Sequence, residues 1–340
     1  MSSKRKKLSI VVPVYFNELN IPHTLPRLRN LENLLPRYEL EFVFVDDGSR
    51  DKSFQLLHEE FLRDPRIIVV RLSKNFGSMS AIEAGLNYAT GDCVGIIAAD
   101  LQDPPELFAE MVRRWEGGKK IVMATRRHRE DPFVERLFSN TYYYILDKFA
   151  LSGYPRGGFD FVLVDKQIVQ EVISISEKNT NIMSLIFWLG HDQDSIQYVR
   201  QERIHGESKW TFPKKVKLFV DSFVSFSYAP VRFMSFVGFG TASLSFLYGV
   251  YVIINTLNGN IRVQGWTTIV TIVSFLLGLI MIMLGTIGEY LWRILDESRN
   301  RPRFVVDQVL LHRPERGIVP SQKRRSTMIS PGRRTKRMLP

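Results

Sequence analysis

The feature that most constrains this chain is a pair of long runs without charged side chains. One run spans residues 233–257 and the other spans residues 266–288. Each reaches the roughly 20 residues that an α-helix needs to cross a hydrocarbon core of about 30 Å. A pair of buried helices in a soluble core is the alternative, but such helices rarely lack charge on every face. We therefore expect two transmembrane helices in a hairpin over residues 229–305.

Positive charges flank the expected hairpin on both outer sides. They are Lys214, Lys215, Lys217 and Arg232 before the first run, and Arg293, Arg299, Arg301 and Arg303 after the second. The short connection at residues 258–262 contains one cation, Arg262. The positive-inside rule then predicts a multi-pass protein of the cell (inner) membrane with both termini and the preceding domain in the cytoplasm.

Two further segments adjoin the hairpin. Residues 213–228 place apolar side chains at helical spacing and lysines in the first turns, which is typical of an amphipathic helix in the membrane surface. An amphipathic helix packed on the protein is the alternative. Residues 306–340 are predicted to be a basic, disordered cytoplasmic tail, either attracted to anionic headgroups or solvated without function.

Residues 1–212 alternate short apolar runs with helical patterns. This alternation predicts an α/β domain with a mostly parallel sheet and helices on both faces. The expected strands are 8–14, 41–45, 67–72, 93–98 and 121–124, with helices that include 53–61 and 80–88. The single cysteine, Cys93, lies among apolar residues and excludes an intramolecular disulfide framework or a multi-cysteine zinc site.

The chain is basic, with a formal net charge of +11. Charge of this sign indicates an anionic partner, and nucleic acid, anionic lipid and a phosphorylated substrate all qualify. The sequence around the expected strands is more specific, because parallel α/β sheets bind ligands beyond the carboxyl ends of their strands.

Polar residues follow each of the first four expected strands. The four segments read PVYFNE (13–18), DDGSRD (46–51), KNFG (74–77) and DLQDPP (100–105). Ordinary turn and cap chemistry explains any one of them, and for Asp51 capping of the helix at Ser53 is the better interpretation. Four such segments in one crevice favour binding of a base and ribose, with a hard divalent cation beside a diphosphate.

These motifs resemble those of family 2 glycosyltransferases with the GT-A (Rossmann-like) fold. The closest resemblance is to polyprenyl-phosphate glycosyltransferases, such as bactoprenol glucosyltransferases and dolichyl-phosphate mannose synthases. It extends from about residue 8 to residue 308. The segments that carry it are VVPVYFNE (11–18), VDDGSRD (45–51), KNFG (74–77), ADLQDPPE (99–106), ATR (124–126), HGESKW (205–210), GEYL (288–291) and RPR (301–303).

The resemblance implies roles at the donor side of the site. It places the donor nucleotide against Pro13, Tyr15, Glu18 and Asp47. It also implies that Asp100 and Gln102 help to hold Mg²⁺ or Mn²⁺ at the diphosphate. Such an ion would neutralise the negative charge that develops on the leaving group.

The metal motif departs from the family pattern. Where relatives usually read Asp-x-Asp, this chain reads Ala98-Ala99-Asp100, so one carboxylate is missing. Asp103 or water would have to replace it, or the metal would bind more weakly.

The resemblance also implies a base and an acceptor site. Asp160 aligns with the proposed base, although Phe159 and Val162 replace a glycine and an arginine of the usual pattern. A structural turn aspartate is the alternative for Asp160. The acceptor phosphate is expected to contact Arg126, Arg136, Arg203 and Lys209, for each of which a solvated surface charge is the alternative.

The predicted function is inverting transfer of one sugar from a nucleotide diphosphate sugar to polyprenyl (undecaprenyl-type) phosphate at the cytoplasmic membrane face. The product would supply a lipid-linked sugar for cell-envelope glycan or glycoconjugate modification. The expected partners are the donor, the lipid acceptor, the bilayer and a possible second copy of the chain, without nucleic acid. Three alternatives are a processive polysaccharide synthase, an inactive membrane adaptor and a nucleic-acid binder. The first would need a Gln-x-x-Arg-Trp motif, which the chain lacks.

Overall fold

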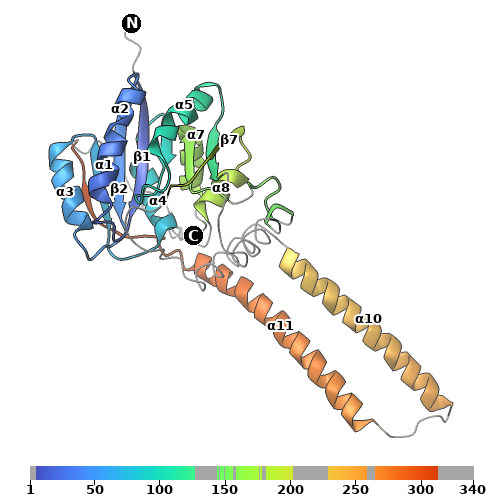
Figure 1. Cartoon of the computed structure of the whole chain (residues 1–340). Coiled ribbons are helices and arrows are strands. Elements are labelled where there is room, and N and C mark those ends of the chain that lie inside the picture. Colours follow the sequence, from blue (N-terminus) through green and yellow to red (C-terminus); the bar gives the residue numbers. More distant parts are fainter. Residues whose placement is uncertain are drawn as a thin grey trace, which may run out of the picture.

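The computed structural model describes residues 5–126, 144, 146–148, 150–155, 158–175, 177, 181–201, 229–258 and 265–312. An α/β domain lies at one end, and two long helices extend from it side by side (Figure 1). The expected order of a domain followed by two helices is therefore present.

A sheet of eight strands forms the centre of the described domain, in the order β7-β5-β6-β4-β1-β2-β3-β8. Strands β1 to β4 are parallel to their neighbours among themselves, and β5 is parallel to β7. Strand β6 is antiparallel to β4 and β5, and β8 is antiparallel to β3. The prediction of a mostly parallel sheet is confirmed. The strands are β1 Lys6–Val14, β2 Tyr38–Asp46, β3 Ile67–Leu72, β4 Cys93–Ile96, β5 Ile121–Arg126, β6 Phe161–Asp165, β7 Gln193–Tyr198 and β8 Val306–Leu310.

Helices cover both faces of the sheet, as expected. One apolar cluster joins the sheet to α1, α2, α3 and α5, and a second joins it to α4, α7 and α8. Because both faces are covered, the central strands are almost continuously apolar instead of alternating. The helices of the domain are α1 Ile21–Arg29, α2 Leu31–Leu34, α3 Ser53–Arg63, α4 Ser78–Tyr88, α5 Phe108–Glu116, α7 Lys166–Ser174 and α8 Ile182–Trp188, with a short 3₁₀ turn, η1, at Pro105–Leu107.

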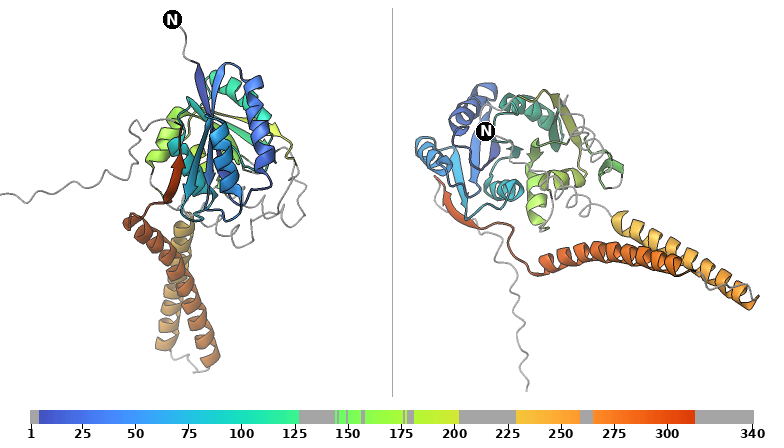
Figure 2. Two further views of the ribbon diagram at one scale, coloured as in Figure 1. Left: turned by 90° about the vertical axis from the view of Figure 1, so that its left-hand side faces the viewer. Right: turned by 60° about the horizontal axis from the view of Figure 1, so that its bottom comes forward.

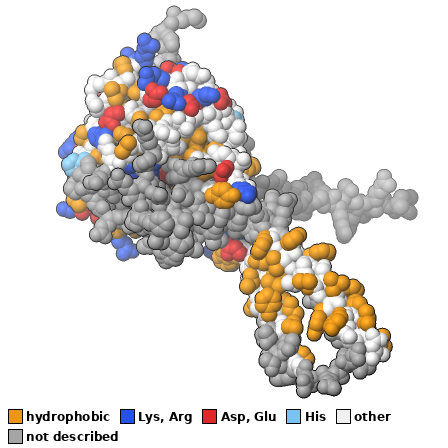
Figure 3. All heavy atoms as spheres, turned by 45° about the vertical axis from the view of Figure 1, so that its right-hand side comes forward, with side chains coloured by type: hydrophobic (Ala, Val, Ile, Leu, Met, Phe, Trp, Pro, Cys, Tyr) orange, Lys and Arg blue, Asp and Glu red, His pale blue; other side chains and the backbone are white. Residues whose placement is uncertain are grey.

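The two expected membrane segments are both helical, but one of them meets the length and composition needed to cross a bilayer. Helix α10 is Ala229–Leu257 and helix α11 is Trp266–Ser298. Within α11 the stretch Phe275–Ser298 is long and apolar enough, whereas the apolar stretch of α10, Phe233–Tyr248, is shorter. Apolar side chains of both helices are exposed along the pair (Figure 3). The second span therefore stays a prediction, and the surface helix at residues 213–228 lies outside the described residues.

The prediction of a disordered tail from residue 306 is wrong at its start. Val306–Leu310 forms strand β8, which pairs with β3 at the edge of the sheet (Figure 2). The segment is short and carries Asp307 and Gln308, so it lacks the apolar run by which the five expected strands were predicted. A partner strand far away in the sequence stabilises it. Residues 313–340 lie outside the described part.

Candidate functional site

The loops after β1, β2 and β3 are hydrogen-bonded to one another, so the first three predicted strand ends do form one edge. The N–H of Phe16 donates to Oγ of Ser49 over 3.0 Å, and the N–H of Asn17 donates to Oγ of Ser53 over 2.9 Å. The N–H of Asp47 donates to the carbonyl of Val14 over 2.9 Å. The convergence follows from parallel pairing, which brings the carboxyl ends of adjacent strands together.

Asp47 links the second loop to the third. Its carboxylate accepts from the N–H of Phe76 at 2.7 Å and from that of Gly77 at 2.9 Å, directly before α4 begins. The side chain is buried, and this burial raises the pKa of Asp47 to about 6 despite the two N–H donors. Asp47 thus holds the start of α4, and a direct contact with a nucleotide stays a prediction.

Gly48 allows the same loops to meet. Its φ is +68°, in the left-handed region that favours glycine, and a Cβ there would lie 2.6 Å from the backbone carbonyl carbon of Lys74. The DDGS segment is therefore packed against the KNFG segment, backbone to backbone.

The other predicted donor residues lie around these loops. Pro13 is in β1, beside Val45 of β2, and the ring of Tyr15 meets the ring of Phe16 edge to face at 4.6 Å between centroids. Glu18 accepts from the N–H of Lys52 over 2.9 Å, so its carboxylate supports the turn that leads into α3. A contact between these residues and a nucleotide stays a prediction.

Asp51 behaves partly as expected. Its Oδ1 accepts from the N–H of Ser53 over 3.1 Å, which satisfies a donor at the start of α3. Lys52, however, is the residue that occupies the N-cap position.

A second cluster lies where β5, β6 and β7 approach the loop after β4. Nη2 of Arg126 lies 2.7 Å from Oδ2 of Asp160, so the predicted phosphate-binding cation is paired with the predicted base. The Arg126 side chain is 11% exposed, whereas that of Asp160 is 61% exposed. An open hollow of about 400 Å³ adjoins Arg126, with Thr125 and Gln197 among its polar lining. A fixed cation beside an accessible carboxylate can bind an anion and orient it.

Three more residues complete this cluster: Tyr198 and Arg200, which sequence reasoning did not assign, and Asp103, which it named as a replacement for the missing metal-binding carboxylate. Asp103 is buried and accepts a hydrogen bond from the hydroxyl of Tyr198, and Nε of Arg200 lies 3.8 Å from its Oδ1. Tyr198 is directly beside Arg126 in the parallel register of β5 and β7. Burial raises the pKa of the Asp103 carboxyl, an effect that Tyr198 and Arg200 oppose.

Arg200 connects the cluster electrostatically. Burial and the neighbouring Arg126 lower the pKa of Arg200. The carboxylates of Asp103, Asp100 and Asp160 oppose this lowering without reversing it. Two guanidinium groups thus face three carboxylates at the ends of β4 to β7. The sequence offered no motif for Tyr198 and Arg200, because the spatial pairing of β5 with β7 is what makes them neighbours of Arg126.

The metal-binding prediction rests on Asp100 and Gln102. The N–H of Gln102 donates to Oδ1 of Asp100 over 3.3 Å, and the carbonyl of Gln102 accepts from the N–H of Gln201, after β7, over 2.9 Å. Among the described residues, no group of three or more His, Cys, Asp or Glu side chains could enclose a metal. Mg²⁺ is commonly bound by one or two carboxylates together with substrate phosphates. The half-buried Asp100 fits a cation whose coordination a diphosphate completes, and does not fit an all-protein site.

The remaining predicted acceptor residues, Arg136, Arg203 and Lys209, lie outside the described residues. Of the four predicted cations, the structure therefore places Arg126 alone. Its neighbour Arg200 is a further cation at the same point.

The sequence matches a protein-family model over its first half and known relatives over nearly the whole chain. The model of "Glycosyl transferase family 2" matches residues 9–173. The "Uncharacterized glycosyltransferase YkcC" of Bacillus subtilis (strain 168) is 37% identical over 308 residues, which cover 90% of this chain and 95% of that protein. The "Bactoprenol glucosyl transferase" of Shigella phage SfV is 34% identical over 301 residues, or 88% of this chain and 98% of that protein.

Among solved structures, the mannosyltransferase PcManGT from Pyrobaculum calidifontis, in complex with GDP-Man and Mn²⁺, aligns with a TM-score of 0.43 at 17% identity. The alignment covers 60% of this chain and 58% of that one. The relatives in sequence match over almost their full length, and together with the family model they show that this chain belongs to glycosyltransferase family 2.

Proposed function

We propose that the protein transfers one sugar from a nucleotide diphosphate sugar to polyprenyl phosphate at the cytoplasmic face of the membrane. The observation that carries the proposal is the 34% identity to a bactoprenol glucosyl transferase, which extends over 88% of this chain and so includes the helix pair. A family 2 domain alone would leave the acceptor open. Similarity through the helices favours a lipid acceptor.

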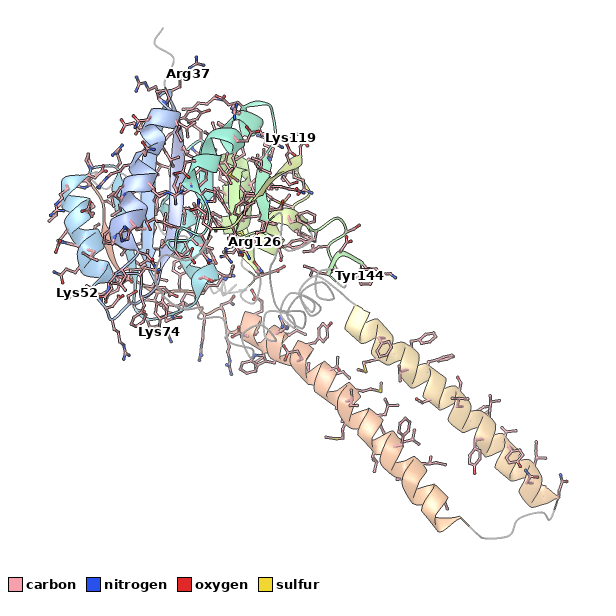
Figure 4. All side chains as sticks on the ribbon, in the orientation of Figure 1. Arg37, Lys52, Lys74, Lys119, Arg126 and Tyr144 are labelled. Carbon is pink, nitrogen blue, oxygen red and sulfur yellow. The ribbon has the colours of Figure 1, made fainter. Side chains whose placement is uncertain are left out.

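The placement of the site supports a lipid acceptor as well. Lys52 and Lys74, which follow β2 and β3, lie at the end of the domain toward the helix pair, and Arg37, which precedes β2, lies at the opposite end (Figure 4). The carboxyl ends of these strands therefore face the side from which α10 and α11 extend. A phosphate at headgroup level would approach the domain from that side.

The residues of the second cluster would act on the acceptor. Arg126 and Arg200 would bind the acceptor phosphate, since guanidinium groups match phosphate oxygens geometrically. A phosphate oxygen would attack the anomeric carbon as the bond from that carbon to the diphosphate breaks, with inversion. The acceptor is already anionic, so Asp160 would mainly orient it and would contribute less as a base than with a hydroxyl acceptor.

The loops after β1 to β3 would bind the nucleotide, with Asp47 holding the start of α4 in place. Asp100 and Gln102 would hold a divalent ion, Mg²⁺ or Mn²⁺, which when bound would neutralise charge on the leaving diphosphate. The missing carboxylate at Ala98 makes a weakly held ion the expectation.

The test is a transfer assay with the full chain in detergent. The protein is incubated with undecaprenyl phosphate, Mg²⁺ or Mn²⁺ and a panel of nucleotide sugars, and the lipid fraction is analysed by mass spectrometry. We expect one donor to add a single hexose-sized mass to the lipid. Addition of several sugars would favour a polymerising enzyme, and neither transfer nor donor hydrolysis at any metal concentration would favour an adaptor.

A further inference from the structure

The chain that leaves helix α11 is bound to the α/β domain immediately. Helix α11 ends at Ser298, and Asn300 has a φ of +47°, a left-handed conformation that turns the chain away from the helix axis. Five residues later the carbonyl of Val305 accepts from the N–H of Ser73 over 2.9 Å. Strand β8 then continues along β3, with Val309 beside Val70. The membrane-side helix and the sheet edge are therefore joined by a short segment, residues 299–305, that is hydrogen-bonded to the domain at Val305.

Within this segment Arg303 reaches helix α4. Its Nη1 lies 2.8 Å from Oε2 of Glu83, and the two side chains are 9% and 12% exposed. Burial raises the pKa of Glu83, and the charge of Arg303 opposes this rise. A buried pair of this kind is costly to break from one side, because the remaining charge loses its partner without regaining water. Phe304 and Val306 also pack against the apolar cluster that contains α4.

Helix α4 in turn begins at the loop after β3, one of the three loops after β1, β2 and β3 that would bind the nucleotide and that we call the donor loops. It starts at Ser78, directly after the two N–H groups that the Asp47 carboxylate binds. It is pressed closely on the sheet, since a Cβ at Gly85 would lie 2.4 Å from Cγ1 of Val11. A helix of 11 residues held this tightly moves as a unit. A contact at Glu83 therefore affects the position of Phe76 and Gly77.

We propose that Arg303 is a positioning residue for the donor side of the site, acting through Glu83 and helix α4 on the Phe76 and Gly77 amides that hold Asp47. The segment that follows α11 thereby fixes the position of the donor loops relative to α11. The role assigned to these loops rests on the proposed function. The link from Arg303 to the start of α4 stands on contacts alone.

The test compares hydrogen exchange in full-length protein in lipid nanodiscs. The variants are Arg303→Met, Glu83→Gln and the two combined, with Arg301→Met as the matched control, since Arg301 is an exposed arginine of the same segment. We expect exchange in residues 76–83 to rise about tenfold in each single variant and to stay at wild-type rates in β1 and β2. The double variant should be no faster than either single variant, because each already breaks the same pair. Arg301→Met should match the wild type.

Nucleotide binding gives the second readout. Uridine diphosphate and guanosine diphosphate are titrated into each protein, and the one that binds the wild type should bind Arg303→Met about tenfold more weakly and Arg301→Met equally well, a difference of about 1.4 kcal/mol. Unchanged exchange in residues 76–83 would overturn the proposal. So would a uniform rise throughout the domain, or additive effects in the double variant. If neither nucleotide binds the wild type, the donor role fails, while the exchange data still decide whether Arg303 positions α4.

Discussion

Arg126 and Asp160 form an ion pair, with 2.7 Å between Nη2 and Oδ2, at the end of β5 and just before β6. Arginine is held firmly by burial, and the aspartate is mostly exposed. An acceptor phosphate that binds Arg126 would compete with Asp160 for the same guanidinium. The pair thus places the Asp160 carboxylate next to the cation that would bind the acceptor phosphate.

The Asp160→Asn variant should lose transfer activity by about 100-fold, since it removes both the negative charge and the pairing with Arg126. Its folding should be unaffected, because the side chain is 61% exposed. Asp192→Asn is a matched control, as Asp192 is also 61% exposed and pairs with Lys119 at 2.8 Å. Initial rates with donor and lipid phosphate check the prediction. Full turnover by Asp160→Asn would remove Asp160 from the mechanism.

Asp47 should make stability depend on pH in the acidic range. Its pKa rises from 3.8 to about 6 on folding, so between these values the folded protein binds more protons than the unfolded chain. Stability should therefore fall as pH rises through this window, by about 3 kcal/mol, and level off above pH 6. Thermal unfolding followed by tryptophan fluorescence at several pH values checks this. Asp47→Asn should lack this component, and a pH profile identical to that of the wild type would contradict the assignment.

Gly48→Ala should damage the donor loops. The new Cβ would strain a backbone with φ of +68° and collide with Lys74 at 2.6 Å. Gly118→Ala is the matched control, because Gly118 has φ of +101° but open space around its Cβ position. We expect both variants to lose roughly 1 kcal/mol of stability from backbone strain, and Gly48→Ala to lose more. Nucleotide binding should fall in Gly48→Ala alone, and equal effects in both variants would mean that the contact with Lys74 is unimportant.

The predicted membrane topology can be tested by cysteine labelling. The natural thiol, Cys93, is buried, and burial raises its pKa, so it should give little background. In intact cells a membrane-impermeant maleimide should label Asn258→Cys, at the end of α10. It should label Lys119→Cys, on the α/β domain, after lysis only. Labelling of Lys119→Cys in intact cells would place the domain outside, and failure at Asn258→Cys would argue against two spans.

Much of the domain was predictable because local patterns decide it. Ile67–Leu72 was predicted with its observed bounds, since a short apolar run between turn residues has few alternatives. The predicted strand at 93–98 ends earlier, at Ile96, because beyond it the backbone turns into the loop that carries Asp100. The convergence of the loops after β1, β2 and β3 followed from parallel pairing.

The features of the site that the sequence did not predict depend on contacts between residues far apart in the chain. Arg200 and Tyr198 join the site because β7 pairs with β5, a register that the sequence of neither strand encodes. Arg303 lies in a segment, residues 299–305, with three arginines and one proline, and its burial against Glu83 requires the strand that follows. Asp47 was predicted for its type and place, but its two hydrogen bonds to backbone N–H groups were not predicted.

The pairing of β3 with β8 also affects how the protein is made. Their sequences are separated by roughly 230 residues, and both long helices lie between them. During synthesis from the N-terminus, one edge of β3 stays unpaired until both helices and β8 have left the ribosome. An open edge can pair with another chain, so this interval carries a risk of aggregation. The sheet can therefore be completed only after the helix pair has been synthesised.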